Sequence, residues 1–148
     1  MSAGNFVPYS NALEKIFLNF LEISNGAFYA ALLKDTYSFD KNNHMTYQDV
    51  RPYLCTDSTC SFVPVTGMAV TRSGPSIQVS CASPISFGSS VTLTAKYIVI
   101  VAGEATKPAD SDLLLGCCDM RPEGGSVSST NGPFLISVDP KGLFSVTN

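Results

Sequence analysis

The sequence predicts a mainly β domain, an antiparallel β-sandwich or barrel-like fold, with one amphipathic α-helix near its N-terminus. The longest strand signal is residues 90–101, SVTLTAKYIVIV, which alternate in their first half and are apolar through most of their second half. Turn signals rich in Gly, Pro, Asn and Asp recur about every ten residues, as they do in sandwiches and barrels. Apolar residues in the segment 11–23 recur with the period of an amphipathic helix.

Length and composition favour one domain with a partly covered surface. The 148 residues are enough to bury a hydrophobic core, so we expect a single β-rich domain over residues 1–148. Charged residues make up 14% of the chain, whereas about a quarter is usual. So little charge favours a surface that partners cover, and a monomer with a Ser- and Thr-rich surface is the alternative.

Charge and hydropathy also narrow the class of partner. The nine Lys and Arg residues are scattered, which argues against a nucleic-acid groove. No stretch reaches the roughly 18 apolar residues of a membrane span. The N-terminal segment MSAGNFVPYS has neither the basic start nor the apolar core of a secretory signal. We therefore expect a protein made in a cytoplasm, with neither nucleic acid nor a membrane as its partner.

The first 26 residues predict an extended arm followed by a helix. Apolar residues in positions 1–9 follow neither the helix nor the strand period, so this segment is predicted to be the extended arm. Residues 11–23 form the helix, with Asn11 as the N-cap, Glu14 completing a capping box and Gly26 ending the segment. The apolar stripe of this helix consists of Leu13, Ile16, Phe17, Phe20 and Leu21. Such a stripe favours packing on a sheet over binding a partner.

The middle of the chain predicts a short strand and a long polar loop. Residues 27–33, AFYAALL, favour a strand, although a helix is the alternative. Residues 35–48 form the loop, and residues 47–54 predict a helical turn that Pro52 ends. Loops of this length are usually functional or ordered by a neighbour.

Two segments are candidate contact elements for a partner. One is the arm at residues 1–9, and the other is the loop at residues 35–48, which is rich in aromatic residues. The candidate contact residues of the loop are Tyr37, Phe39, His44 and Tyr47. The alternative is that both segments are merely mobile.

The second half predicts short strands separated by turns. Beside the segment at residues 90–101, the predicted strands are residues 63–72, 76–82, 113–118, 134–138 and 143–147. Gly74-Pro75 joins the first pair, and a type I turn over residues 139–142 joins the last pair, with Gly142 at the position of positive φ. Residues 83–89 and 120–130 are predicted loops.

Five cysteines leave at least one thiol unpaired within the chain. Cys55 and Cys60 flank the short polar segment TDST and are the candidate disulfide. Cys117 and Cys118 are adjacent, so in a strand they point to opposite faces. The alternatives are reduced structural thiols throughout, or a disulfide between chains.

No catalytic pattern is present in the sequence. His44 is the only histidine, and the spacing of the cysteines does not match a zinc site. Asp110, Asp112 and Asp119 lie close together in sequence, which allows a glycosidase-like pair or a Ca²⁺ loop, but turn and edge positions explain them more simply. We therefore predict no catalytic residue, no metal ligand, no cofactor and no small-molecule substrate. The protein is predicted not to be an enzyme.

Several segments, taken in order, resemble a family of small structural proteins of tailed bacteriophages. The resemblance begins with AALLKDTYSFDKNNHMTYQDV at residues 30–50 and includes the strand at residues 65–72 and AKYIVIVAG at residues 95–103. It continues with DSDLLLGCCDM at residues 110–120 and NGPFLISVDPKGLFSV at residues 131–146. Family members share an ALL…D.Y opening, a Y.DV segment, an LLG.ID strand and a C-terminal NG.F.I…G.F pattern.

The resemblance implies a virion component that is assembled in the host cytoplasm. The role it implies first is a head decoration or cement protein, whose partners are the major capsid protein and copies of itself, as in a trimer. A tail or fibre component that contacts other tail proteins or a host surface molecule is the alternative. The resemblance carries no catalytic residue.

Overall fold

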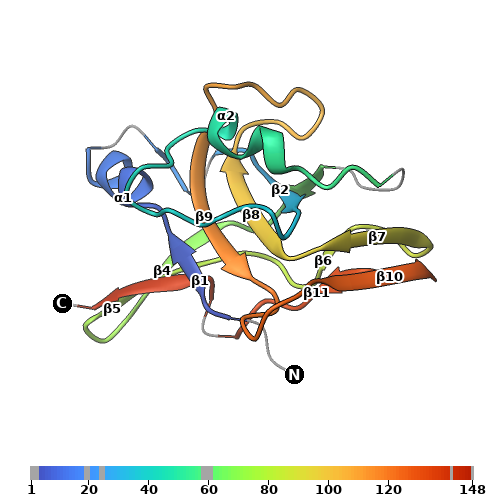
Figure 1. Cartoon of the computed structure of the whole chain (residues 1–148). Coiled ribbons are helices and arrows are strands. Elements are labelled where there is room, and N and C mark those ends of the chain that lie inside the picture. The colour runs from blue at the N-terminus through green and yellow to red at the C-terminus, as the bar shows by residue number, and fades with distance from the viewer. Residues whose placement is uncertain (1–3, 19–20, 24–25, 58–61, 141, 148) are drawn as a thin grey trace.

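The computed structural model describes residues 4–18, 21–23, 26–57, 62–140 and 142–147. It is mainly β, with 41% strand and 11% helix, and its antiparallel sheets form a sandwich-like fold (Figure 1). The predicted fold class is therefore confirmed.

The largest sheet has five antiparallel strands in the order β1, β9, β8, β2, β3. Their bounds are β1 Phe6–Pro8, β9 Leu113–Asp119, β8 Tyr97–Ala102, β2 Phe28–Leu33 and β3 Val63–Val65. All six residues of β2 and the four inner residues of β8 are buried. Since β2 and β8 are apolar on both faces, other parts of the chain must cover the sheet on both sides.

The remaining strands form three smaller sheets. Their bounds are β4 Ala69–Ser73, β5 Ser76–Ser80, β6 Ile85–Ser86, β7 Val91–Ala95, β10 Val127–Gly132, β11 Leu135–Ile136 and β12 Phe144–Thr147. One sheet has the order β12, β5, β4, and the others are the pairs β10 with β7 and β11 with β6. The predicted turn at Gly74-Pro75 joins β4 to β5, and Gly74 has a φ of 59°.

Each face of the five-stranded sheet has its own cover. On one face Tyr29 packs edge-on against Tyr47 and Phe62. On the other face Ile98 and Ile100 line the same groove as residues of β6, β11 and β12. The core therefore has two layers, one on either side of β2 and β8.

The predicted single strand at residues 90–101 is wrong, because the chain changes sheets at Lys96. β7 pairs with β10, whereas β8 pairs with β2 and β9. At the bend, the Lys96 N–H donates to the Leu33 carbonyl at 2.9 Å, and the Lys96 carbonyl accepts from the Met120 N–H at 2.8 Å. The Lys96 ammonium forms an ion pair with Asp119. The side chain and the backbone of Lys96 therefore both hold the chain in place at this bend.

The helix is shorter than predicted and begins at a different residue. α1 spans Ser10–Phe17, its N-cap is Tyr9 rather than Asn11, and no side chain caps it. Tyr9 is fully buried and its N–H is bonded to the Leu115 carbonyl, which fixes where the helix begins. Leu21 is buried but lies beyond the helix, and Phe20 lies outside the described residues.

The N-terminal arm is partly a strand of the sheet. Residues 6–8 form β1, which pairs with β9. Phe6 lies over Gly116, where an added Cβ would clash with its ring. The absence of a side chain at Gly116 thus lets the arm seat against the sheet.

Other predictions fail in detail. The predicted strand at residues 63–72 is divided into β3 and β4 by Gly67, whose φ is 68°. The predicted loops at residues 83–89 and 120–130 contain β6 and the start of β10. The helical turn is real, as α2 Tyr47–Val50 and the 3₁₀ helix η1 Arg51–Tyr53, but Pro52 lies inside η1 and does not end it.

Removing Lys96 should destabilise the fold far more than removing an exposed cation. The Lys96 ammonium lies 2.9 and 3.0 Å from the Asp119 oxygens and 2.7 Å from the Arg121 carbonyl oxygen. Its side chain is only 12% exposed, so Lys96→Met leaves these acceptors largely desolvated. We expect the free energy of unfolding to fall by about 2 kcal/mol in urea denaturation.

The matched control is Arg51→Met. Arg51 also holds a carboxylate, Asp110, at 2.8 Å, but both side chains are about half exposed (54% and 48%). Its loss should cost less than about 1 kcal/mol. Equal losses in the two variants would contradict a structural role for the Lys96 bend.

Candidate partner-binding surface

Tyr37, one of the predicted contact residues, belongs to the core. It is 2% exposed, and its hydroxyl lies 2.8 Å from the Tyr9 hydroxyl and 2.8 Å from His44 Nδ1. Its ring also contacts Tyr53 and Tyr97. Tyr37 therefore anchors the long loop to its own chain.

The other three candidate residues also pack against their own chain. Phe39 is half-buried, with its ring 5.1 Å from that of Tyr9. His44 is half-buried beside Tyr37. Tyr47 is 5% exposed and packs against the Tyr29 ring. The loop is thus ordered by its own core, and its contact with a partner stays a prediction.

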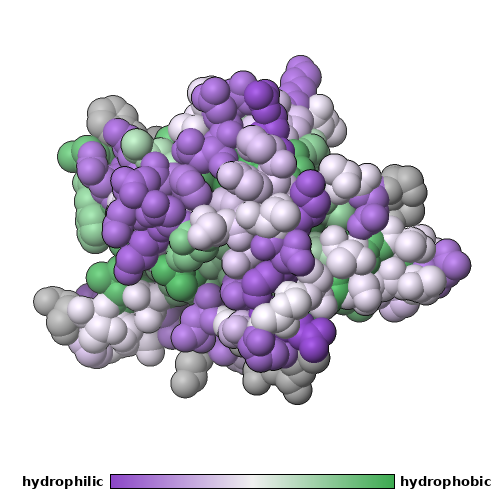
Figure 2. Space-filling view, in the orientation of Figure 1, coloured by the Kyte–Doolittle hydropathy of each residue, from purple (hydrophilic) through white to green (hydrophobic). Residues whose placement is uncertain are grey.

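A groove of about 750 Å³ opens between β1 and the C-terminal segment, on the face of the sheet away from Tyr29. Its floor is apolar and comes from β8 and the end of β9. Its described lining residues include Phe6, Ile98, Ile100, Cys118, Met120, Ile136, Val138, Leu143 and Phe144. Figure 2 shows hydrophobic surface where β1 passes β12. The Phe6 and Phe144 rings are stacked with their centroids 6.1 Å apart.

Among the described residues, the free thiols are those of Cys81, Cys117 and Cys118. As predicted for adjacent strand residues, Cys118 lines the groove whereas Cys117 is buried near Tyr9. Burial raises the pKa of Cys118 to about 11 and raises the pKa of Cys117 further. At neutral pH both are protonated thiols, which are poor nucleophiles.

The predicted disulfide between Cys55 and Cys60 stays a prediction, because Cys60 lies outside the described residues.

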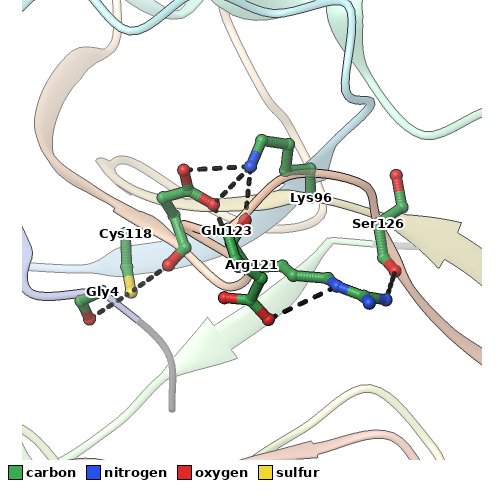
Figure 3. A network of polar contacts seen from close by, with 7 residues as sticks. Gly4, Lys96, Cys118, Arg121, Glu123 and Ser126 are labelled. Carbon is green, nitrogen blue, oxygen red and sulfur yellow. Dashed lines mark hydrogen bonds and ion pairs between the residues drawn. The ribbon is translucent and has the colours of Figure 1, made fainter. Parts of the chain in front are cut away.

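A network of polar contacts closes the end of β9 (Figure 3). Asp119 binds the Lys96 ammonium and also accepts from the Arg121 N–H at 2.9 Å. Arg121 then donates from its guanidinium to the Ser126 carbonyl at 3.2 Å. The Cys118 thiol donates to the Gly4 carbonyl at 3.2 Å. This network joins the segment before β1 to the end of β9 and the loop that follows it.

The three nearby aspartates serve three separate contacts. Asp112 accepts from the Tyr29 hydroxyl at 3.0 Å and from the Ala109 N–H at 2.8 Å. Asp110 binds Arg51, and Asp119 binds Lys96. Within the described ranges no three His, Cys, Asp or Glu side chains come together as metal ligands. The aspartates therefore hold the fold together at three different places.

No helix among the described residues has the long apolar run needed to cross a bilayer.

No protein-family model matches this chain, and no curated protein or solved structure matches it. The groove therefore has to be interpreted from its own residues.

Sequence reasoning missed the groove, since its parts are far apart in the chain. Residues 4–8 form one wall, and residues 136–140 and 142–145 form much of the other. The sequence shows the apolar residues Ile136, Val138 and Phe144. It does not show which strands these residues face, because that depends on how the strands are arranged in the fold.

Alkaline pH should destabilise the fold. Burial raises the pKa values of Tyr9, Tyr29 and Tyr37 above the ordinary tyrosine value, and that of Cys118 to about 11. The unfolded chain loses these protons near pH 8.5 for cysteine and near pH 10 for tyrosine. Stability is therefore complete below about pH 8.5 and falls as the pH rises toward 11 and beyond. Urea unfolding midpoints measured across this range test the expectation.

The control for the alkaline series is Cys118→Ala, which removes one of these groups. Its unfolding free energy should decline less steeply than that of the parent chain between about pH 8.5 and 11. A parent chain whose stability is constant or rises over this range would contradict the burial of these groups.

Proposed function

We propose that this protein is a structural component of a bacteriophage virion, and specifically a head decoration protein that binds where capsomers meet. The proposal rests on the ordered set of motifs that resembles small phage structural proteins. The observation that supports it further is an apolar groove between β1 and the C-terminal segment of a mainly β scaffold.

The surface chemistry supports binding of protein rather than of a charged ligand. Asp139 is the only charged side chain among the described residues that line the groove. The titratable groups of the described core are neutral thiols and tyrosines or are engaged in pairs such as Lys96–Asp119. Such a protein can act through the shape and apolar area that it presents.

A decoration protein gains its effect from repetition. A single protein interface of about 1,000–1,600 Å² is ordinary in size. Copies bound over a capsid lattice act together, so that modest contacts resist opening of the shell collectively. Contacts with the major capsid protein and with neighbouring copies of this chain would both contribute.

The test uses heads of the encoding phage that lack this protein. Purified chain should bind these heads to saturation and raise the temperature at which they release DNA, because each bound copy adds buried contact area at a seam. DNA release is followed with a dye during heating, and bound copies are counted by quantitative gel analysis. The same heads without added protein are the control.

A second measurement separates the head from the tail. Disrupted particles are fractionated into heads and tails, and the chain is located by mass spectrometry. Its presence in the tail fraction alone would overturn the decoration role in favour of a tail or fibre component. Heads of equal heat resistance with and without bound protein would overturn a cementing role.

A further inference from the structure

Asn131 and Gly132 lie in an irregular step at the end of β10. The register of β10 with β7 shifts between Ser129 and Gly132, and Asn131 has no paired residue in it. Asn131 has a φ of 47°, and it is the only described residue other than glycine with a positive φ. Regular strand pairing therefore does not hold Asn131 in place, as is usual in a β-bulge.

This step projects from the body of the molecule. β10 and β7 form a two-stranded sheet of their own, and the end of β10 lies at the right-hand tip of Figure 1. Asn131 is exposed and Gly132 is half-buried. Because two paired strands are only marginally stable alone, the end of this pair can open locally while the core stays folded.

An asparagine that precedes a glycine can react with its own main chain. The main-chain nitrogen of the next residue attacks the side-chain amide carbon, and a cyclic imide forms. Glycine has no Cβ to obstruct the approach of its nitrogen. Here the nitrogen belongs to Gly132 and the carbon is Asn131 Cγ. The two groups are already joined through the chain, so no second molecule has to bind before the ring closes.

The Thr92 hydroxyl contacts the main chain and the side chain of Asn131. It accepts from the Asn131 N–H at 3.1 Å and donates to Asn131 Oδ1 at 3.4 Å. A donor at Oδ1 makes Cγ more electrophilic and stabilises the negative charge that forms on Oδ1 as the nitrogen adds. The side-chain amide is therefore both exposed and polarised for the attack.

The other described asparagines lack this arrangement, because a residue with a side chain follows each of them. They are Asn5, Asn11, Asn42 and Asn43. The Asn43 amide also donates to the Asp40 carboxylate at 2.8 Å, which restrains it. Asn25 precedes a glycine as well, but it lies outside the described residues, so the experiment has to assign the modified residue.

We propose that Asn131 is a site of spontaneous deamidation, which proceeds through a cyclic imide formed with the Gly132 nitrogen. Hydroxide removes the Gly132 N–H proton, and the nitrogen bonds to Asn131 Cγ. The Cγ–Nδ2 bond then breaks, and Nδ2 takes a proton from water and leaves as ammonia.

Water completes the reaction by opening the imide ring. Addition of water at Cγ breaks the bond from Cγ to the Gly132 nitrogen and leaves an aspartate. Addition at the main-chain carbonyl carbon of Asn131 leaves the chain joined through Cγ, as an isoaspartate. Hydroxide and water are the only other reactants, and no atom is oxidised or reduced.

Either product changes the tip of β10. The new carboxylate lowers the formal net charge from −3 by one. Isoaspartate also adds a methylene group to the main chain beside Thr92, so we expect the end of the β10–β7 pair to loosen while the five-stranded sheet is unchanged. The inference does not depend on the proposed function.

The experiment follows the purified full chain over days at about pH 7 and about pH 8, below the range in which its thiols and tyrosines ionise. Anion exchange separates the more acidic form. Peptide mass spectrometry assigns the modified residue, and fragmentation distinguishes aspartate from isoaspartate. We expect modification at Asn131 that is about tenfold faster at the higher pH, because hydroxide generates the attacking nitrogen.

Two variants that suit the backbone test the route. A Cβ on Gly132 would lie 3.5 Å from Ser129 Oγ and 3.7 Å from the Thr130 carbonyl oxygen, which are ordinary contacts. Gly132→Ala should therefore fold like the parent chain but react about tenfold more slowly or less, because the Cβ hinders the approach of the nitrogen. Asn131→Gly keeps a residue that tolerates the positive φ and should give no acidic form from this site.

The outcomes separate the site from the route. A parent chain that stays unmodified at Asn131, or whose acidic form maps to Asn25 or another asparagine, would overturn the site. Equal rates at Asn131 in the parent chain and in Gly132→Ala would overturn the imide route in favour of direct hydrolysis of the amide by water.

Discussion

The bend at Lys96 determines how the layers of this protein meet. Its backbone pairs with both neighbours, at the Leu33 carbonyl and the Met120 N–H, so it behaves as a strand residue. Its ammonium is fixed by Asp119 and by the Arg121 carbonyl, at the start of the loop that leads to β10. One side chain therefore joins the end of β9 to the point where β7 gives way to β8.

The change of sheet sends β7 to pair with β10, while β8 stays in the centre of the five-stranded sheet. The short strand β1 ends that sheet on one side. β12 ends its own sheet near β1, and the stacked rings of Phe6 and Phe144 join the two without a main-chain pairing between them. The groove lies over the apolar face of β8, between β1 and the C-terminal segment.

Local chemistry made part of this fold predictable from sequence. β2, β8 and β9 are runs of apolar and β-branched residues, and Gly74-Pro75 allows little other than a turn. The sheet change at Lys96 was not predictable, because alternation and hydropathy continue through that residue and the bend depends on Asp119, 23 residues away. The start of α1 after Tyr9 and the burial of Tyr37 likewise depend on contacts that only the folded chain makes.

The aromatic loop shows why composition alone does not separate a contact with a partner from a contact within the chain. Tyr37 and Tyr47 are amphipathic, and a loop that carries them is equally suited to cover its own sheet or a partner. Here the Tyr37 hydroxyl is engaged by Tyr9 and His44, and the Tyr47 ring packs against Tyr29. The groove is different, because its lining comes from segments that are far apart in the chain, and Asp139 is the only charged side chain among its described lining residues. Only the topology brings these apolar residues to one place, so composition alone could not indicate the groove.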